Sequence, residues 1–197
     1  MKVVLADYGA GNLRSVCAAL ERAGASPEIS TDPATVREAP LAVISGVGHL
    51  DSAARGLAPL ADALRERASA GRPLFGICVG MQLLFEESEE GGSGFGLLEG
   101  PVRRLQARRV PHMGWNALAL TRPSALLDGL DGADVYFAHS FAAEPAGQVG
   151  VAEVEHGGSV AAAVESGPLA GVQFHPERSG AAGTRVLENA IRWSRSA

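Results

Sequence analysis

The sequence contains one lysine, Lys2, and two cysteines, Cys17 and Cys78, among its 197 residues. A single lysine at the start of the chain argues against covalent chemistry through a lysine amine. Two cysteines this far apart form neither a disulfide framework nor a Cys-x-x-Cys pair, and their surroundings lack the spacing of a zinc site. Catalytic chemistry therefore has to come from other side chains or from one cysteine that acts alone.

Long apolar runs and an excess of positive charge are also missing. No stretch approaches the ~20 apolar residues that a membrane-spanning helix needs, and residues 1–7 lack a signal-peptide layout, so we expect a cytoplasmic protein. The net charge of −5 argues against nucleic acid as the main partner. We interpret the arginine cluster at 103–109 as a solvated strand edge or loop.

The length and composition predict one domain over residues 1–197. The first half alternates strands with helices, which predicts an α/β fold with a central, mostly parallel sheet and helices on both faces. The expected strands here are 2–6, 27–30, 41–45 and 73–77, and the expected helices are 12–22, 32–38, 57–69 and 81–86. The second half is strand-rich, with expected strands at 102–105, 117–120, 135–137, 149–155, 160–165 and 171–174 before a final helix at 181–195.

Cys78 lies in the pentapeptide Gly76-Ile77-Cys78-Val79-Gly80, between an expected strand and an expected helix. This is the elbow pattern of G-x-S-x-G enzymes with sulfur in place of oxygen. Glycines on both sides relieve the crowding of so tight a turn. The thiol then points out of the sheet, at the positive end of a helix, where the thiolate is favoured.

A general base for this nucleophile is expected in the segment Gln173-Phe174-His175-Pro176-Glu177. His175 follows an apolar strand, and Glu177 is close enough in sequence to orient the imidazole. Cysteine, histidine and glutamate are sufficient for acyl transfer: the imidazole takes the thiol proton, the thiolate attacks a carbonyl, and the imidazolium protonates the leaving amine.

An oxyanion intermediate needs backbone N–H donors. The elbow supplies that of Val79, and the glycine-rich loop Gly46-Val47-Gly48, which follows the strand 41–45, is the candidate for the second. Gly46 and Gly48 are plausible hinges of that loop. Gln82, one helical turn after Cys78, either contacts the substrate or faces solvent.

These motifs together resemble the class I (triad) glutamine amidotransferases. The segments GICVGMQ, QFHPE and GVG match three signatures of that family, in its order. Further segments resemble the branch of the family that supplies ammonia for histidine biosynthesis: DYGAGNLRSV (7–16), GVGHL (46–50), VPHMGWN (110–116), YFAHSF (136–141) and GVQFHPERS (171–179).

The resemblance implies a flavodoxin-like fold and hydrolysis of glutamine to glutamate and ammonia through a thioester on Cys78. It implies a heterodimer with a cyclase subunit, a (β/α)8 barrel, which uses the ammonia to make imidazole glycerol phosphate and an aminoimidazole carboxamide ribonucleotide. No cofactor or metal is implied. The implied residues are the triad Cys78, His175 and Glu177; oxyanion groups at Val47, Gly48 and Val79; substrate contacts at Gly46, Gln82, His139, Ser140 and Phe141; and interface residues Asn12, Trp115, Tyr136 and Arg178.

Two other functions remain open at this level. A stand-alone cysteine amidase with the same triad would be fast without a partner. A binding module that kept the fold but lost its activity would not react with a glutamine-like electrophile at Cys78.

Two positions depart from the family pattern. Arg178 stands where lysine is usual, and its planar fork would remake any interface ion pair in a different geometry. Ser45 stands where many relatives have a proline before the GVG loop. Proline restricts φ, so its absence loosens the loop.

We predict that the Ser45→Pro variant has a lower glutaminase turnover than the parent chain when no partner is present, because the stiffer loop holds its resting conformation. Ammonia release from glutamine by the isolated chains measures this. Equal or higher turnover of the proline variant contradicts the prediction.

Overall fold

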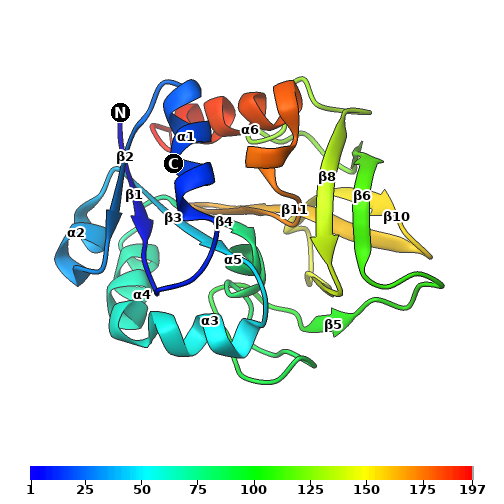
Figure 1. The fold of residues 1–197 in the computed structure, drawn as a ribbon, viewed down its shortest axis with the longest axis horizontal. Coiled ribbons are helices and arrows are strands. Elements are labelled where there is room, and N and C mark those ends of the chain that lie inside the picture. Colours follow the sequence, from blue (N-terminus) through cyan, green and yellow to red (C-terminus); the bar gives the residue numbers. More distant parts are fainter. Residues whose placement is uncertain (197) are drawn as a thin grey trace.

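The computed structural model describes residues 1–196, and its centre is an eight-stranded sheet in the order β2-β1-β3-β4-β12-β11-β10-β7 (Figure 1). The first five strands in this order pair in parallel, and the remaining three pairs are antiparallel. An order of 2-1-3-4 followed by one more parallel strand is that of flavodoxin-like folds. The strands are β1 (Lys2–Ala6), β2 (Ser26–Ser30), β3 (Leu41–Gly46), β4 (Leu74–Cys78), β7 (Ala119–Leu120), β10 (Gly150–Glu155), β11 (Ser159–Ser166) and β12 (Leu169–Val172).

Helices cover both faces of this sheet, as predicted. Figure 1 shows α1 (Leu13–Arg22) and α6 (Gly180–Trp193) on one side, and α3 (Leu50–Leu57), α4 (Ala61–Ser69) and α5 (Val79–Gln82) on the other. α2 (Pro33–Glu38) packs against α4. Every residue of β3 and β4 is buried, as expected for parallel strands covered on both faces. No helix within residues 1–196 is long and apolar enough to cross a membrane.

The strand-rich second half adds two small antiparallel sheets to the main one. They pair β5 (Val102–Arg104) with β9 (Phe141–Ala143), and β6 (His112–Ala117) with β8 (Asp134–His139). Figure 1 shows β6 and β8 side by side at one end of the main sheet. The four arginines of the 103–109 cluster are exposed, as predicted.

The sequence reading missed β6, β9 and α3. Polar residues and a glycine interrupt the apolar pattern of β6, in which buried or half-buried residues alternate with exposed ones. The expected helix 57–69 is divided: α3 ends at Leu57, and a 3₁₀ turn, η1 (Ala58–Leu60), separates it from α4. Pro59 in this turn has no N–H, so a continuous helix cannot form there.

The helix expected at 81–86 is also corrected. α5 begins directly after Cys78 and ends at Gln82. The amides of Leu84 and Phe85 bond to the third residue before them, which tightens the chain. Phe85 then bridges to Leu98. A single helical turn contributes little macrodipole, so the helix lends the thiolate less support than the sequence suggested.

Arg67 is a fully buried charge that ties α4 to its neighbours. Its guanidinium donates to the carbonyls of Pro73, Val36 and Arg37 at 2.7–3.0 Å. Burial, followed by repulsion from Arg72, lowers its pKa to about 10, so the group stays charged at neutral pH. The carbonyls of Val36 and Arg37 in α2 therefore depend on this side chain, which also shares the Pro73 carbonyl, just before β4, with the Ala42 amide.

We predict that Arg67→Ala lowers the free energy of unfolding by about 3 kcal/mol, because four hydrogen bonds from one buried charge to backbone carbonyls are lost. Arg65→Ala, on the same helix and half exposed, is the matched control and changes stability by less than about 1 kcal/mol. Urea denaturation measures both. An Arg67 variant as stable as the Arg65 variant contradicts the prediction.

Candidate active site

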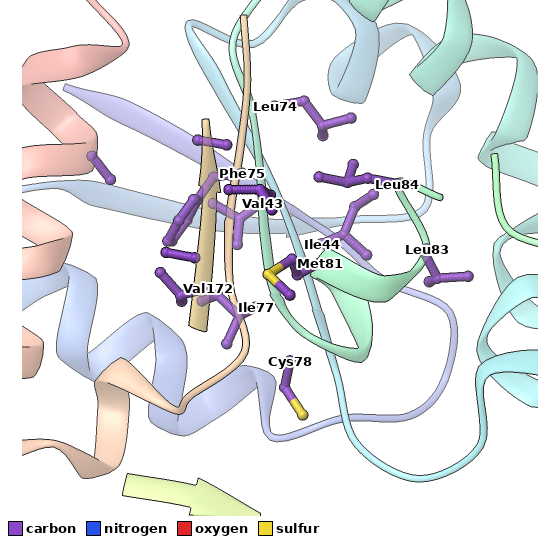
Figure 2. Packing of buried hydrophobic residues seen from close by; sticks show 14 of the residues in the cluster. Val43, Ile44, Leu74, Phe75, Ile77, Cys78, Met81, Leu83, Leu84 and Val172 are labelled. Carbon is purple, nitrogen blue, oxygen red and sulfur yellow. The ribbon is translucent and has the colours of Figure 1, made fainter. Parts of the chain in front are cut away.

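Cys78 ends β4 in a strained turn. Its φ of 54° is the one left-handed value of a non-glycine residue in the described chain. A Cβ on Gly80 would overlap the carbonyl of Ile44, and one on Gly76 would overlap the backbone of Gly80. Both flanking glycines are therefore required by close backbone packing, as the elbow pattern predicted. Figure 2 shows the sulfur pointing away from the apolar side chains of the strand and of Met81.

The neighbouring strands bring two more segments to this turn. Gly46, the last residue of β3, lies opposite Cys78 in the sheet register. β12, on the other side of β4, ends at Val172, and the chain continues through His175 into the 3₁₀ turn η2 (Pro176–Arg178). Carboxyl ends of parallel strands meet at one edge, so the three segments converge there.

His175 and Glu177 form a buried pair beside the sulfur. The His175 Nδ1 lies 3.0 Å from Glu177 Oε1, and their side chains are 5% and 2% exposed. Burial disfavours the charged imidazole, but hydrogen bonds and negative charge from Cys78 and Glu177 outweigh it and raise the pKa of His175 to about 10. The structure thus brings the three predicted triad residues together, with an imidazolium at neutral pH.

A small cavity opens onto the sulfur. Its walls contain most of the residues that the sequence assigned to oxyanion and substrate contacts: Gly48, Val79, Gln82, His139, Ser140 and Phe141, with Ala138 and Glu90 in addition. Gln82 is 2% exposed, so it does not face solvent. Gly46 lies behind this wall in β3, and the Val47 side chain is 46% exposed.

Glu90 and Tyr8 are the site residues that the sequence reading missed. Glu90 belongs to an acidic loop without a motif; its carboxylate accepts from the Leu50 amide at 2.7 Å and lies 3.1 Å from His49 Nδ1. It thereby links the wall of the cavity to the start of α3, just after the Gly46-Val47-Gly48 loop.

Tyr8 lies beneath the same loop. Its hydroxyl is buried and finds no hydrogen-bond partner within residues 1–196. Burial raises the pKa of Tyr8 to about 12, although the nearby Val47 amide opposes the rise. A Cβ on Gly46 would lie 2.6 Å from this hydroxyl. The loop glycine therefore leaves room for a tyrosine.

The predicted interface residues share one face. Trp115 and Tyr136 lie opposite each other in β6 and β8 with ring centres 6.0 Å apart, and the Arg178 guanidinium stacks on Tyr136 at 4.2 Å. Asn12 precedes α1, which packs against η2. Met113, 66% exposed, and Trp115, 58% exposed, give this face an apolar character.

Comparisons with known proteins show the family to which this chain belongs. The model of the glutamine amidotransferase class-I family matches residues 4–193. The chain is similar to proteins named imidazole glycerol phosphate synthase subunit HisH. It is 45% identical to that of Halobacterium salinarum, over 96% of this chain and 92% of the relative. It is 46% identical to that of Mycolicibacterium paratuberculosis, over 96% of each.

Solved structures share the fold. The crystal structure of a glutamine amidotransferase superposes with a TM-score of 0.79 at 20% identity, covering 98% of both chains. The structure of PurLQS from Thermotoga maritima gives a TM-score of 0.78 at 22% identity, again over 98% of both chains.

We predict that Glu177→Gln lowers the pKa of His175, because one of the two partners that favour its charged form becomes neutral. In the parent chain the imidazole stays protonated as the pH rises through 8; in the variant it releases its proton at lower pH. An NMR titration of the His175 Cε1 proton measures this. Glu86→Gln, at an exposed glutamate, is the matched control. An unchanged His175 titration in the Glu177 variant contradicts the prediction.

Proposed function

Because this chain belongs to the class-I glutamine amidotransferases, we propose that it is the glutaminase subunit of an imidazole glycerol phosphate synthase, in histidine biosynthesis. It hydrolyses glutamine to glutamate and ammonia and passes the ammonia to a cyclase subunit. The observation that carries the proposal is the buried convergence of Cys78, His175 and Glu177 in a chain 45–46% identical to subunits of that name.

The reaction follows from the charge state of the site. The Cys78 thiolate attacks the side-chain amide carbon of glutamine, and the carbonyl oxygen becomes an oxyanion. The His175 imidazolium gives its proton to the nitrogen, so that the C–N bond breaks, ammonia leaves and a γ-glutamyl thioester remains. The neutral imidazole then takes a proton from water, whose oxygen attacks the thioester and releases glutamate. Glu177 holds the ring and balances its charge throughout.

The loop Gly46-Val47-Gly48 controls the oxyanion site in this proposal. Val79 and Gly48 line the cavity, which supports a role for their amides. The Val47 amide is close enough to the Tyr8 hydroxyl to affect its pKa, which supports a resting loop in which this donor is turned away from the sulfur. One missing oxyanion donor costs roughly 10²–10³ in rate. Rotation of the one peptide between Gly46 and Val47 is then a sufficient switch.

Substrate binding is assigned to the remaining walls of the cavity. Gln82 and the segment from His139 to Phe141 line the cavity together with Cys78, a position suited to the α-amino acid end of glutamine. Gly46 supports this wall from β3, where a larger residue would meet Tyr8 and Val79. No cofactor takes part, and residues 1–197 act as one glutaminase domain.

The cyclase docks on the face formed by Met113, Trp115, Tyr136 and Arg178, with Asn12 at its margin. Ala138 supports this choice, because it pairs with Met113 across the strands and also lines the cavity. The docking face therefore borders the site where ammonia is released. The partner is a (β/α)8 barrel, the assembly is a heterodimer, and the complex works in the cytoplasm.

We predict that the purified chain releases ammonia from glutamine slowly, and that its cyclase, loaded with its own substrate, raises the rate roughly 10²–10³-fold by completing the oxyanion site. Cys78→Ser removes the activity in both cases. A coupled glutamate assay with and without the cyclase measures this. Equal turnover without the partner supports a stand-alone amidase instead, and no labelling of Cys78 by a glutamine-like electrophile supports a binding module.

The coupled glutamate assay, titrated with the cyclase to give its affinity, also tests the docking face. Trp115→Ala weakens binding of the cyclase by roughly 30-fold, since exposed tryptophans at the centre of interfaces contribute most of their energy, while turnover of the isolated chain stays the same. Asp62→Ala, on the exposed surface of α4, is the matched control. Unchanged partner affinity of the Trp115 variant refutes this docking face.

A further inference from the structure

Gln173 is a buried polar residue that the reaction described above does not use. It is fully buried between β12 and His175. Its Nε2 lies 3.6 Å from the Cys78 Sγ, a hydrogen-bond distance for an acceptor as large as sulfur. A nitrogen this close to the reacting atom has to be either a donor that favours the thiolate or an accident of packing.

The hydrogen-bond partners of Gln82 and Gln173 fix which end of each amide faces the sulfur. The Phe141 carbonyl can only accept, so the Gln82 atom 2.7 Å away is its NH₂ group. The same NH₂ lies 3.0 Å from the other end of Gln173, which must then be the oxygen. The Gln173 NH₂ group is therefore the end that faces Cys78.

The Phe141 carbonyl, from which the orientation of both glutamine amides follows, is itself held in place. His139 Nδ1 lies 2.9 Å from it, and burial lowers the pKa of His139 to about 3, so the neutral ring donates its only proton there. The free Nε2 accepts from His112 Nδ1 at 3.2 Å. Two donors, from His139 and Gln82, thus converge on one carbonyl. A flipped Gln82 amide would set its oxygen against the oxygens of Phe141 and Gln173, and a flipped Gln173 amide would set its NH₂ against that of Gln82.

We infer that Gln173 is a second hydrogen-bond donor to the catalytic sulfur and stabilises it as a thiolate, an inference that rests on the proposed function of this site. An NH₂ group cannot accept a proton from a thiol, so this neighbour favours the charged form alone. Five other titratable groups lie around the sulfur and its cavity: the His175 imidazole, Glu177 behind it, the Tyr8 hydroxyl, Glu90 and the neutral His139.

The test is the pH dependence of alkylation of Cys78 by iodoacetamide, followed by mass spectrometry of the peptide that contains it. Gln173→Leu removes the donor at similar volume and moves the pH of half-maximal rate upward by about one unit. Gln173→Glu places a carboxylate beside the sulfur and moves the pH of half-maximal alkylation rate further upward. Gln148→Leu, at an exposed glutamine, leaves it unchanged. In steady-state kinetics of Gln173→Leu, the acidic limb of the kcat–pH profile moves upward by about one unit, with little change in KM.

An unchanged alkylation midpoint in Gln173→Leu, with His175→Gln shifting it as a positive control, overturns the inference. Circular dichroism establishes that each variant is folded. Should the leucine variant not fold, the alkylation midpoint of the isosteric Gln173→Glu variant tests the inference by the same criterion. Alkylation needs no glutamine. A chain that fails to hydrolyse glutamine but shows the shifted midpoints therefore refutes the proposed function and leaves the role of Gln173 intact.

Discussion

A buried charge has to be matched by other buried groups, and most of this site can be understood from that requirement. The His175 ring is almost inaccessible to water and yet favours its charged form. Burial alone would keep it neutral. Glu177 on one nitrogen and the sulfur of Cys78 nearby favour the charged ring through hydrogen bonds and negative charge. Removing any one of these residues would leave a buried charge without its partner, which destabilises the folded chain.

The sheet supplies the geometry for this balance. β4 carries the sulfur, β3 carries the glycine loop, and β12 leads into the histidine and its glutamate, each at the same edge. α5 packs so closely on the strands that Gly76 in β4 and Gly80 in α5 itself have no space for a side chain, and a Cβ on Gly171 in β12 would collide with Met81. The nucleophile is thus held by backbone packing, and the groups around it adjust through side-chain hydrogen bonds.

Much of this arrangement could be predicted from the sequence because it depends on local rules. The parallel strands, the elbow at Cys78 and the histidine after β12 each follow from short patterns of apolar, glycine and polar residues. The missed parts depend on contacts between distant segments. β6 has too polar a face to look like a strand until His112 and Asn116 find partners on β8 and β10. Glu90 lies in no motif, and Tyr8 and Gln173 lie in matched segments that assigned them no role, so only the folded chain shows that all three lie near the sulfur.

The exposure of Met113 and Trp115, two residues apart on β6, has a consequence for the chain when it is not bound to a partner. Two large apolar side chains in a row on an exposed strand form the kind of surface that soluble monomers seldom carry uncovered. Molecules made in excess over their partner would adhere to one another through this strip. The proposed docking face therefore favours production of the two subunits in balanced amounts.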